Sequence, residues 1–216
     1  MQKISGISVC IWDFDGTLYK QQPELWDNIR ESEIRVVQKY TGWSEEKAKA
    51  EFYKIYGVQT PSGTKTTALL TGITNAQASI ESSAGTSYEK YLKKDSKLTE
   101  LFAKLSHLTH YMLVNGSQSS VRRGADLLGL DTGIFTEIVT SEIVGETKPS
   151  QKGFRYILEK TGLPATSHLM VGDREKVDLA PARELGIRTC LVWQDTPGDI
   201  AEVTLPTVYD VVSVLG

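Results

Sequence analysis

Short apolar runs alternate with segments of helical periodicity along most of this chain. Ile7, Val9 and Ile11 alternate with other residues near the amino terminus, which predicts a buried strand over 7–12. From residue 96 onward the pattern predicts four more strands, separated by helices near 98–108, 119–129, 150–161 and 175–185. The strands are expected at 111–114, 136–140, 168–171 and 188–193. Such alternation predicts an α/β fold with a Rossmann-like, doubly wound parallel sheet.

A long helical segment interrupts this alternation after the first strand. Residues 20–94 show helical spacing with several glycine breaks and weak strand signals. We expect helices at 24–40, 44–56, 64–71 and 87–94, and a loop at 82–86. The chain is therefore predicted to form an α/β core domain from 1–19 plus 95–216, and a small all-helical cap domain from 20–94.

Charge and composition exclude several classes of partner. The formal net charge is −3 and the isoelectric point about 5.7, and no basic run is interleaved with aromatics, so we expect no nucleic-acid polymer as a partner. No apolar segment approaches the roughly 20 residues that span a bilayer, and the amino terminus lacks a secretory pattern. Cys10 and Cys190 lie in predicted strands, where reduced thiols pack as small hydrophobes. These features predict a cytoplasmic protein with no membrane partner.

Polar residues suited to chemistry follow the predicted strands. Asp13 and Asp15 come directly after the first strand, where Gly16 breaks it. The corresponding residues beyond later strands are Asn115-Gly116-Ser117, Lys148-Pro149 and Gly172-Asp173. Ligands bind outside the carboxyl ends of the strands in open parallel sheets. We therefore expect these four loops to converge on one site.

The side chains in these loops match the needs of phosphoryl transfer. Asp13, Asp15 and Asp173 form a hard-oxygen set that suits Mg²⁺. A carboxylate can attack phosphorus, so that an aspartyl phosphate forms and then breaks down, while a neighbouring acid transfers the protons. Lys148 supplies a cation, and the amides of Asn115-Gly116-Ser117 can cradle phosphate oxygens.

In these residues and their order, the chain resembles the phosphatase-type hydrolases of the haloacid dehalogenase (HAD) superfamily. The first motif of that family, Asp-x-Asp-Gly-Thr, matches Asp13 to Thr17. The lysine motif matches Lys148-Pro149, and the Gly-Asp-x4-Asp form matches Gly172-Asp173 through Asp178. The resemblance covers nearly the whole chain.

The resemblance also implies a role for each matching residue. Asp13 would be the nucleophile, and Asp15 the general acid/base whose main-chain carbonyl also reaches Mg²⁺. Lys148 would clamp the negative charge, and Asp173 would be a metal ligand. Asp178 would be an acid that contacts the metal ligands without binding the metal itself, or it would bind the metal through a water molecule.

One motif departs from the family pattern. The family places Ser or Thr just before the Asn of its second motif, whereas this chain has Val114 before Asn115. Valine cannot donate a hydrogen bond to phosphate, and loss of one charge-assisted bond costs roughly 1.5 to 3 kcal/mol. Either Asn115 or Ser117 compensates, or phosphate is held less well.

The helical segment resembles the cap that follows the first motif in one HAD subgroup. Within it, Phe52-Tyr53-Lys54-Ile55-Tyr56-Gly57, together with Leu18-Tyr19, is similar to members that act on pyrimidine 5′-nucleotides. Aromatics at this spacing are more often cap core than base-stacking residues.

These observations predict a magnesium-dependent phosphatase that acts on a small phosphorylated metabolite, a nucleoside monophosphate or a sugar phosphate, as a monomer or homodimer. A phosphomutase shares every core residue and stays an alternative, whereas Asp15 disfavours a dehalogenase. A catalytically weak member that binds a ligand or protein is a further alternative, because of Val114. Arg174 is interpreted as a surface charge or a partner of Asp178.

Overall fold

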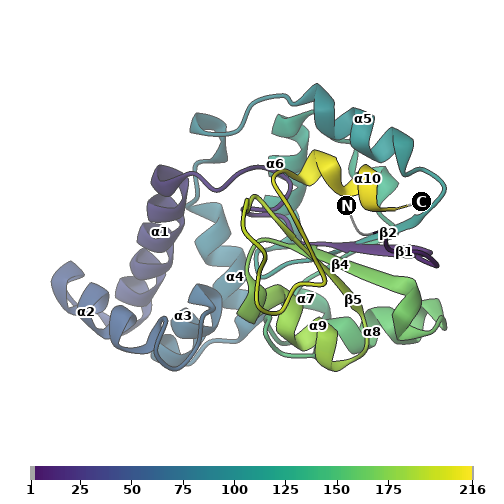
Figure 1. Ribbon diagram of the computed structural model, residues 1–216. Helices are drawn as coiled ribbons and strands as arrows, with labels where there is room; N and C mark the ends of the chain where they lie inside the picture. The colour runs from purple at the N-terminus through teal and green to yellow at the C-terminus, as the bar shows by residue number, and fades with distance from the viewer. Residues whose placement is uncertain (1–2, 216) are drawn as a thin grey trace.

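A computed structural model describes residues 3–215, and it places a six-stranded sheet between two layers of helices (Figure 1). The sheet order is β3-β2-β1-β4-β5-β6, and every neighbouring pair is parallel. The strands are β1 Val9–Trp12, β2 Thr109–Leu113, β3 Glu137–Val139, β4 His168–Gly172, β5 Arg188–Val192 and β6 Val203–Leu205. The predicted α/β, doubly wound fold is confirmed.

Alternate side chains of β1 enter two separate cores. Cys10 and Trp12 join the apolar cluster under α5, α6 and α10, whereas Val9 and Ile11 join the cluster under α8 and α9. Figure 1 shows these helix sets on opposite sides of the sheet. The helices are α5 Ser96–Lys104, α6 Gln118–Leu128, α7 Ser141–Val144, α8 Lys152–Thr161, α9 Ala180–Glu184 and α10 Val211–Val214. Burial on both faces explains the continuous apolar runs of the strands.

The remaining four helices pack mainly on one another beside the sheet (Figure 1). Their bounds are α1 Pro23–Thr41, α2 Glu45–Ile55, α3 Gly63–Thr71 and α4 Asn75–Ala84. They have a small apolar cluster of their own, built on Ile34, Val37, Ala48 and Phe52. Helix α4 also contacts α6 and α7 of the sheet layers. The boundaries proposed for core and cap domains stay a prediction.

The sequence patterns misjudged two short regions. The loop expected at 82–86 is partly wrong, because α4 continues to Ala84, and the helix expected at 87–94 is only a 3₁₀ turn over Tyr88–Lys90. Helix α4 buries Ala78, Ser79 and Ser82, so small residues face its neighbours and no apolar stripe marks it. Strand β6 was not predicted because three residues are too few to show an alternation.

The order in which strands join the sheet fixes where a site can form. The chain adds β2 and β3 on one side of β1 and then returns to place β4 on the other side. A crevice forms at such a switch point, outside the carboxyl ends of the strands. Asp13 follows β1 and Asp173 follows β4, so the two acids flank it. Among the described helices, none is long and apolar enough to cross a bilayer.

Candidate active site

The loop after β1 is held in a tight turn that directs its acids toward the crevice. The amide of Asp13 donates to the carbonyl of Val171 on β4 at 3.0 Å, and the amides of Thr17 and Leu18 donate to Phe14. Gly16 has a φ of +84°, and a Cβ there would lie 2.5 Å from Asp173 Oδ2. Only glycine therefore permits both the backbone conformation and the approach of Asp173.

Lys148 is buried between two carboxylates. Its Nζ lies 2.7 Å from Asp13 Oδ1 and 2.6 Å from Asp178 Oδ1. Burial alone lowers the pKa of Lys148, but the two carboxylates outweigh burial and raise that pKa above its ordinary value. The ammonium therefore remains charged and fixes one oxygen of Asp13.

Asn115 positions Lys148 by a paired backbone interaction. Its side-chain Oδ1 accepts from the Lys148 amide at 2.7 Å, and its Nδ2 donates to the Lys148 carbonyl at 3.0 Å. The carbonyl of Asn115 in turn accepts from the hydroxyls of Thr64 and Ser79, at 3.2 and 3.3 Å. The loop after β2 thus links the lysine to helices α3 and α4.

Three carboxylates gather where a cation would sit. Oxygens of Asp13, Asp173 and Asp178 all lie within 4.8 Å of one another. Burial first, and then the charges of Asp178 and Asp13, raise the pKa of Asp173 to about 8. A closely spaced, buried carboxylate set of this kind fits a hard divalent cation such as Mg²⁺. The predicted ligands Asp13 and Asp173 belong to this cluster, and so does Asp178, which was expected to support the ligands or to bind the metal through water. Asp15 was expected to reach the metal through its main-chain carbonyl, and its side chain does not belong to this cluster.

Asp178 owes its position to an irregular turn. It lies in a π-helical turn, Glu175–Leu179, that leads into α9. Its Oδ2 accepts from the amide of Arg174 at 3.1 Å, and a Cβ on Gly172 would lie only 2.6 Å from the Cβ of Asp178. The carboxylate is completely buried, so its contacts with Lys148 and the Arg174 amide offset its loss of hydration.

Asp15 is held by two tyrosines rather than by a cation. Its Oδ1 accepts from the hydroxyls of Tyr19 at 2.5 Å and Tyr88 at 2.9 Å. Burial raises the pKa of Asp15, and the two tyrosine hydrogen bonds oppose that rise. Sequence reasoning missed Tyr88, because no local pattern marks a residue that the fold brings back to the first motif.

The three residues of the second motif, Asn115-Gly116-Ser117, do not all line the cavity. Asn115 and Gly116 line the cavity in front of Asp15, but Ser117 caps α6, and its Oγ accepts from the Ser120 amide at 3.2 Å. Val114 is buried in the main apolar cluster. The assignment of these residues to phosphate binding stays a prediction.

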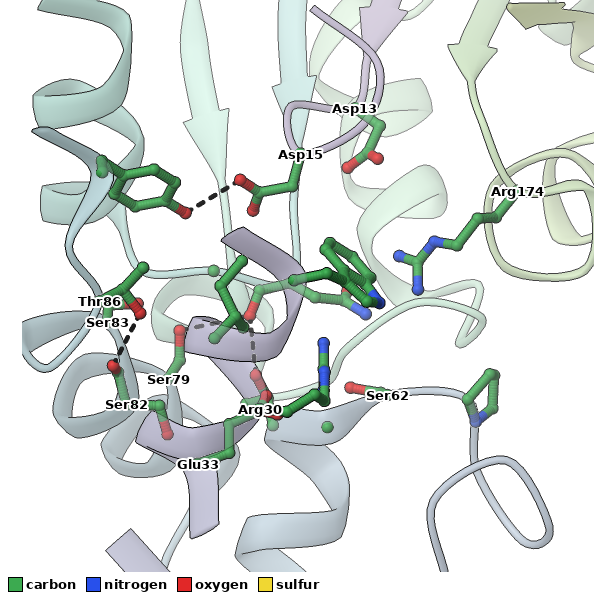
Figure 2. A pocket seen from close by; sticks show the side chains of 18 residues that line it. Asp13, Asp15, Arg30, Glu33, Ser62, Ser79, Ser82, Ser83, Thr86 and Arg174 are labelled. Carbon is green, nitrogen blue, oxygen red and sulfur yellow. Dashed lines mark hydrogen bonds and ion pairs between the residues drawn. The ribbon is translucent and has the colours of Figure 1, made fainter. Parts of the chain in front are cut away.

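A cavity of about 60 Å³ lies beside Asp13 and Asp15, the two acids of the first motif. Figure 2 shows Asp13 and Arg174 pointing toward the same space and Asp15 turned to the other side, with Arg30 and Glu33 of α1 on the opposite wall. Arg174 was interpreted as a surface charge or a partner of Asp178. Its backbone does contact Asp178, but its side chain is about three-quarters buried and lines the cavity.

Aromatic residues divide between packing and the cavity. Phe52 is fully buried and stacks on Tyr56 with ring centroids 5.5 Å apart, so it belongs to the core of the helical unit. Trp26 instead lines the cavity, with the Arg174 guanidinium 5.6 Å from its ring centroid. A tryptophan in a helical pattern gives no sequence signal that distinguishes a pocket wall from a core.

A family model described as haloacid dehalogenase-like hydrolase matches residues 7–186. A curated relative, the glyceraldehyde 3-phosphate phosphatase of Methanocaldococcus jannaschii, is 29% identical over 115 residues, which make up 53% of this chain and 48% of that protein. Pyrimidine 5′-nucleotidase YjjG of Escherichia coli is 44% identical over 57 residues, or 26% of this chain and 25% of that protein. The chain thus matches about half the length, or less, of these curated relatives.

Solved structures show the same fold over almost the whole chain. CbbY of Rhodobacter sphaeroides, in complex with phosphate, has a TM-score of 0.67 at 17% identity, over 94% of this chain and 96% of that one. A HAD phosphatase of Thermococcus onnurineus has a TM-score of 0.65 at 18% identity, over 96% of this chain and 97% of that one.

Proposed function

Because the chain belongs to the haloacid dehalogenase-like hydrolases, we propose that it is a magnesium-dependent phosphatase of small organic phosphate monoesters. The observation that carries the proposal is the contact of the buried Lys148 ammonium with Asp13 Oδ1 at 2.7 Å. A carboxylate with a fixed cation, a neighbouring acid and a cluster of metal-binding oxygens is equipped to attack phosphorus. The curated relatives named above include two phosphate-releasing enzymes, which supports the same reaction class.

Asp13 is the nucleophile in this proposal. Lys148 holds Oδ1, and the Thr17 hydroxyl donates to Oδ2 at 3.3 Å, so the orientation of the carboxylate is set before substrate binds. Attack on phosphorus forms an aspartyl phosphate and breaks the ester bond to the leaving alcohol. Water then attacks phosphorus and releases inorganic phosphate, which regenerates Asp13.

Asp15 moves the protons in both halves of the reaction. Because Oδ1 accepts from Tyr19 and Tyr88, the proton of the neutral acid is carried on Oδ2. That proton passes to the leaving alkoxide. The resulting carboxylate then accepts a proton from the attacking water. Burial raises the pKa of Asp15 and so favours its protonated form before the first step.

Asp13, Asp173 and Asp178 are the side chains that would hold Mg²⁺, together with the main-chain carbonyl of Asp15 that the family resemblance implies. The ion would supply positive charge to offset the phosphate dianion and the acidic cluster. The Lys148 ammonium is a positive charge of the chain itself that also offsets these negative charges.

The proposal is tested by phosphate release from an activated aryl phosphate, with and without Mg²⁺. Asp13→Asn should abolish release, while Asp126→Asn, at an exposed position on α6, should not change it. Release that survives Asp13→Asn would show that Asp13 is not the nucleophile, and no release from the native protein would favour the ligand-binding alternative. Conversion of a sugar phosphate to its isomer without free phosphate would favour a phosphomutase.

A further inference from the structure

Some residues that line the cavity beside Asp13 have buried polar atoms that make no hydrogen bond. Within residues 3–215, Arg30 Nε, Arg174 Nε and Ser82 Oγ are buried without a hydrogen bond, and all three residues line this cavity. A buried donor without a partner is unfavourable, and a bound ligand would satisfy it. The three atoms therefore indicate where the part of the substrate beyond its phosphate is held.

Arg30 is built into the wall rather than extended into solvent. Only 8% of the residue is exposed, and its guanidinium carbon lies 5.0 Å from the Trp26 ring centroid and 4.6 Å from that of Tyr56. Its Nη1 donates to Glu33, which is 3% exposed. A side chain on Gly63 would overlap both members of this pair, so the first turn of α3 closes over them.

The charges around the cavity disfavour a second anion on the substrate. Three lining carboxylates, those of Asp13, Asp15 and Glu33, face two guanidinium groups, those of Arg30 and Arg174. With Asp15 protonated before the first step, a divalent cation, its other ligands Asp173 and Asp178, and Lys148 bring the net charge of the site to about +1, and the phosphate dianion of the substrate would exceed it. Another negative group beside Glu33 would then lack compensation.

A hydroxyl group fits the Arg30–Glu33 pair better than either ion. It can accept from Arg30 Nε and donate to Glu33 at the same time. Ser82 Oγ offers a further hydrogen bond in the same cavity. The cavity has about 60 Å³ of room for water-sized groups, and the phosphate beside Asp13 takes part of it, so a short leaving group fits the remaining space best.

We propose that Arg30 and Glu33 bind a free hydroxyl of the leaving group, and that the substrate is the phosphate ester of a short polyol or hydroxyaldehyde of about three carbons. This inference rests on the proposed phosphatase function. It assigns substrate selection to a charged pair on α1, the first helix after the nucleophile loop, and not to the aromatic residues of α2.

The experiment compares kcat/KM for glycerol phosphate with kcat/KM for n-propyl phosphate, which has the same length and no hydroxyl. We expect the native protein to prefer the hydroxylated ester by about tenfold or more, because a polar pair left unpaired is costly. Uridine monophosphate and a phosphorylated hydroxy acid should be poorer substrates than glycerol phosphate. An aryl phosphate reports whether phosphoryl transfer occurs at all.

Glu33→Gln removes the charged acceptor and keeps the shape of the side chain. The preference for glycerol phosphate should fall to about twofold, because kcat/KM should fall more on glycerol phosphate than on n-propyl phosphate. Glu31→Gln, at an exposed site on the same helix, should keep the full preference. If Glu33→Gln does not fold, the comparison of esters with native protein decides alone.

Three results would overturn the inference: no preference for the hydroxylated ester, a better rate on the nucleotide or the acid, or an equal loss on both esters in Glu33→Gln. With aryl phosphate still hydrolysed, these results would leave the phosphatase function intact. If no ester were hydrolysed, aryl phosphate included, both this inference and the proposed phosphatase function would be overturned.

Discussion

The Tyr88 hydroxyl donates a hydrogen bond of 2.9 Å to Oδ1 of Asp15, although the two residues are 73 positions apart in the chain. Asp15 precedes the four helices beside the sheet, and Tyr88 follows them. The orientation of the proposed general acid/base thus depends on how the chain returns from this helical unit. Tyr19, only four residues from Asp15, supplies the second donor to the same oxygen.

Tyr88→Phe should impair proton transfer without changing the shape of the site. The tyrosine hydrogen bond lowers the pKa of Asp15, so its loss should raise that pKa and move the limb of the pH–rate profile due to Asp15 to higher pH. We expect kcat to fall by about tenfold, the value of one hydrogen bond to a charged group. A pH profile of kcat measures the shift, and Tyr91→Phe, close in sequence, is the control. An unshifted profile would contradict this role.

Lys148→Met should remove both activity and stability. The substitution leaves Asp13 and Asp178 buried without their shared cation, a change that costs about 3 to 5 kcal/mol. Urea unfolding measures the loss, and phosphate release should fall below detection. Adding Asp178→Asn should restore part of the stability but none of the activity. Equal losses in the single and double variants would show that Asp178 is not coupled to Lys148.

Gly16→Ala tests the approach of Asp173 to the first motif. The new Cβ would lie 2.5 Å from Asp173 Oδ2, in a backbone conformation with φ of +84°. Gly57→Ala is the matched control, because Gly57 has φ of +81° and no atom within 4 Å of the Cβ position. Both variants should lose about 1 kcal/mol from backbone strain. Only Gly16→Ala should also weaken Mg²⁺ binding, as measured by calorimetry, and equal Mg²⁺ affinities would contradict the geometry.

Mg²⁺ affinity should increase with pH. In the metal-free protein the pKa of Asp173 is raised to about 8, so below that pH the carboxyl must release a proton before it can bind the ion. Affinity should therefore rise about tenfold per pH unit and level off above about pH 8. Titrations at several pH values measure the slope. In Asp173→Asn the slope should disappear, and a slope that persists there would assign the proton to another group.

Glu33 should make the protein less stable as pH rises. Burial raises the pKa of Glu33 from 4.5 to about 7, against the opposing effect of Arg30. Between these values the folded protein holds a proton that the unfolded chain releases, so stability is greatest below about pH 4.5 and falls until about pH 7. The difference in unfolding free energy between native protein and Glu33→Gln should change by up to about 3 kcal/mol across that window. If the unfolding free energies of native protein and Glu33→Gln changed with pH in parallel, the raised pKa of Glu33 would be contradicted. The control Glu31→Gln should show the same pH dependence of unfolding free energy as the native protein.

Local patterns were sufficient for features that depend on near neighbours in sequence. Burial of β1 on both faces makes Val9 to Trp12 an unbroken apolar run, and the turn at Gly16 follows directly from the glycine. Helix α4 escaped detection because small buried residues such as Ala78 and Ser79 leave no hydrophobic period. The interpretation of Arg174 as a surface charge was wrong for a related reason, since a charged residue in a loop has no sequence signal for the cavity that it lines.

The patterns along the chain were enough to predict the fold class and the side chains that make up the site. Parallel strands end at the same edge of a sheet, so the sequence predicts that Asp13, Lys148 and Asp173 lie close together there. The partner of each carboxylate depends on the folded chain, in which Asp178 contacts Lys148 and Asp15 accepts a hydrogen bond from Tyr88. It also decided that Arg30 and Glu33 face the nucleophile across a small cavity. Distances between elements far apart in sequence arise from packing of the whole chain, and no local pattern records them.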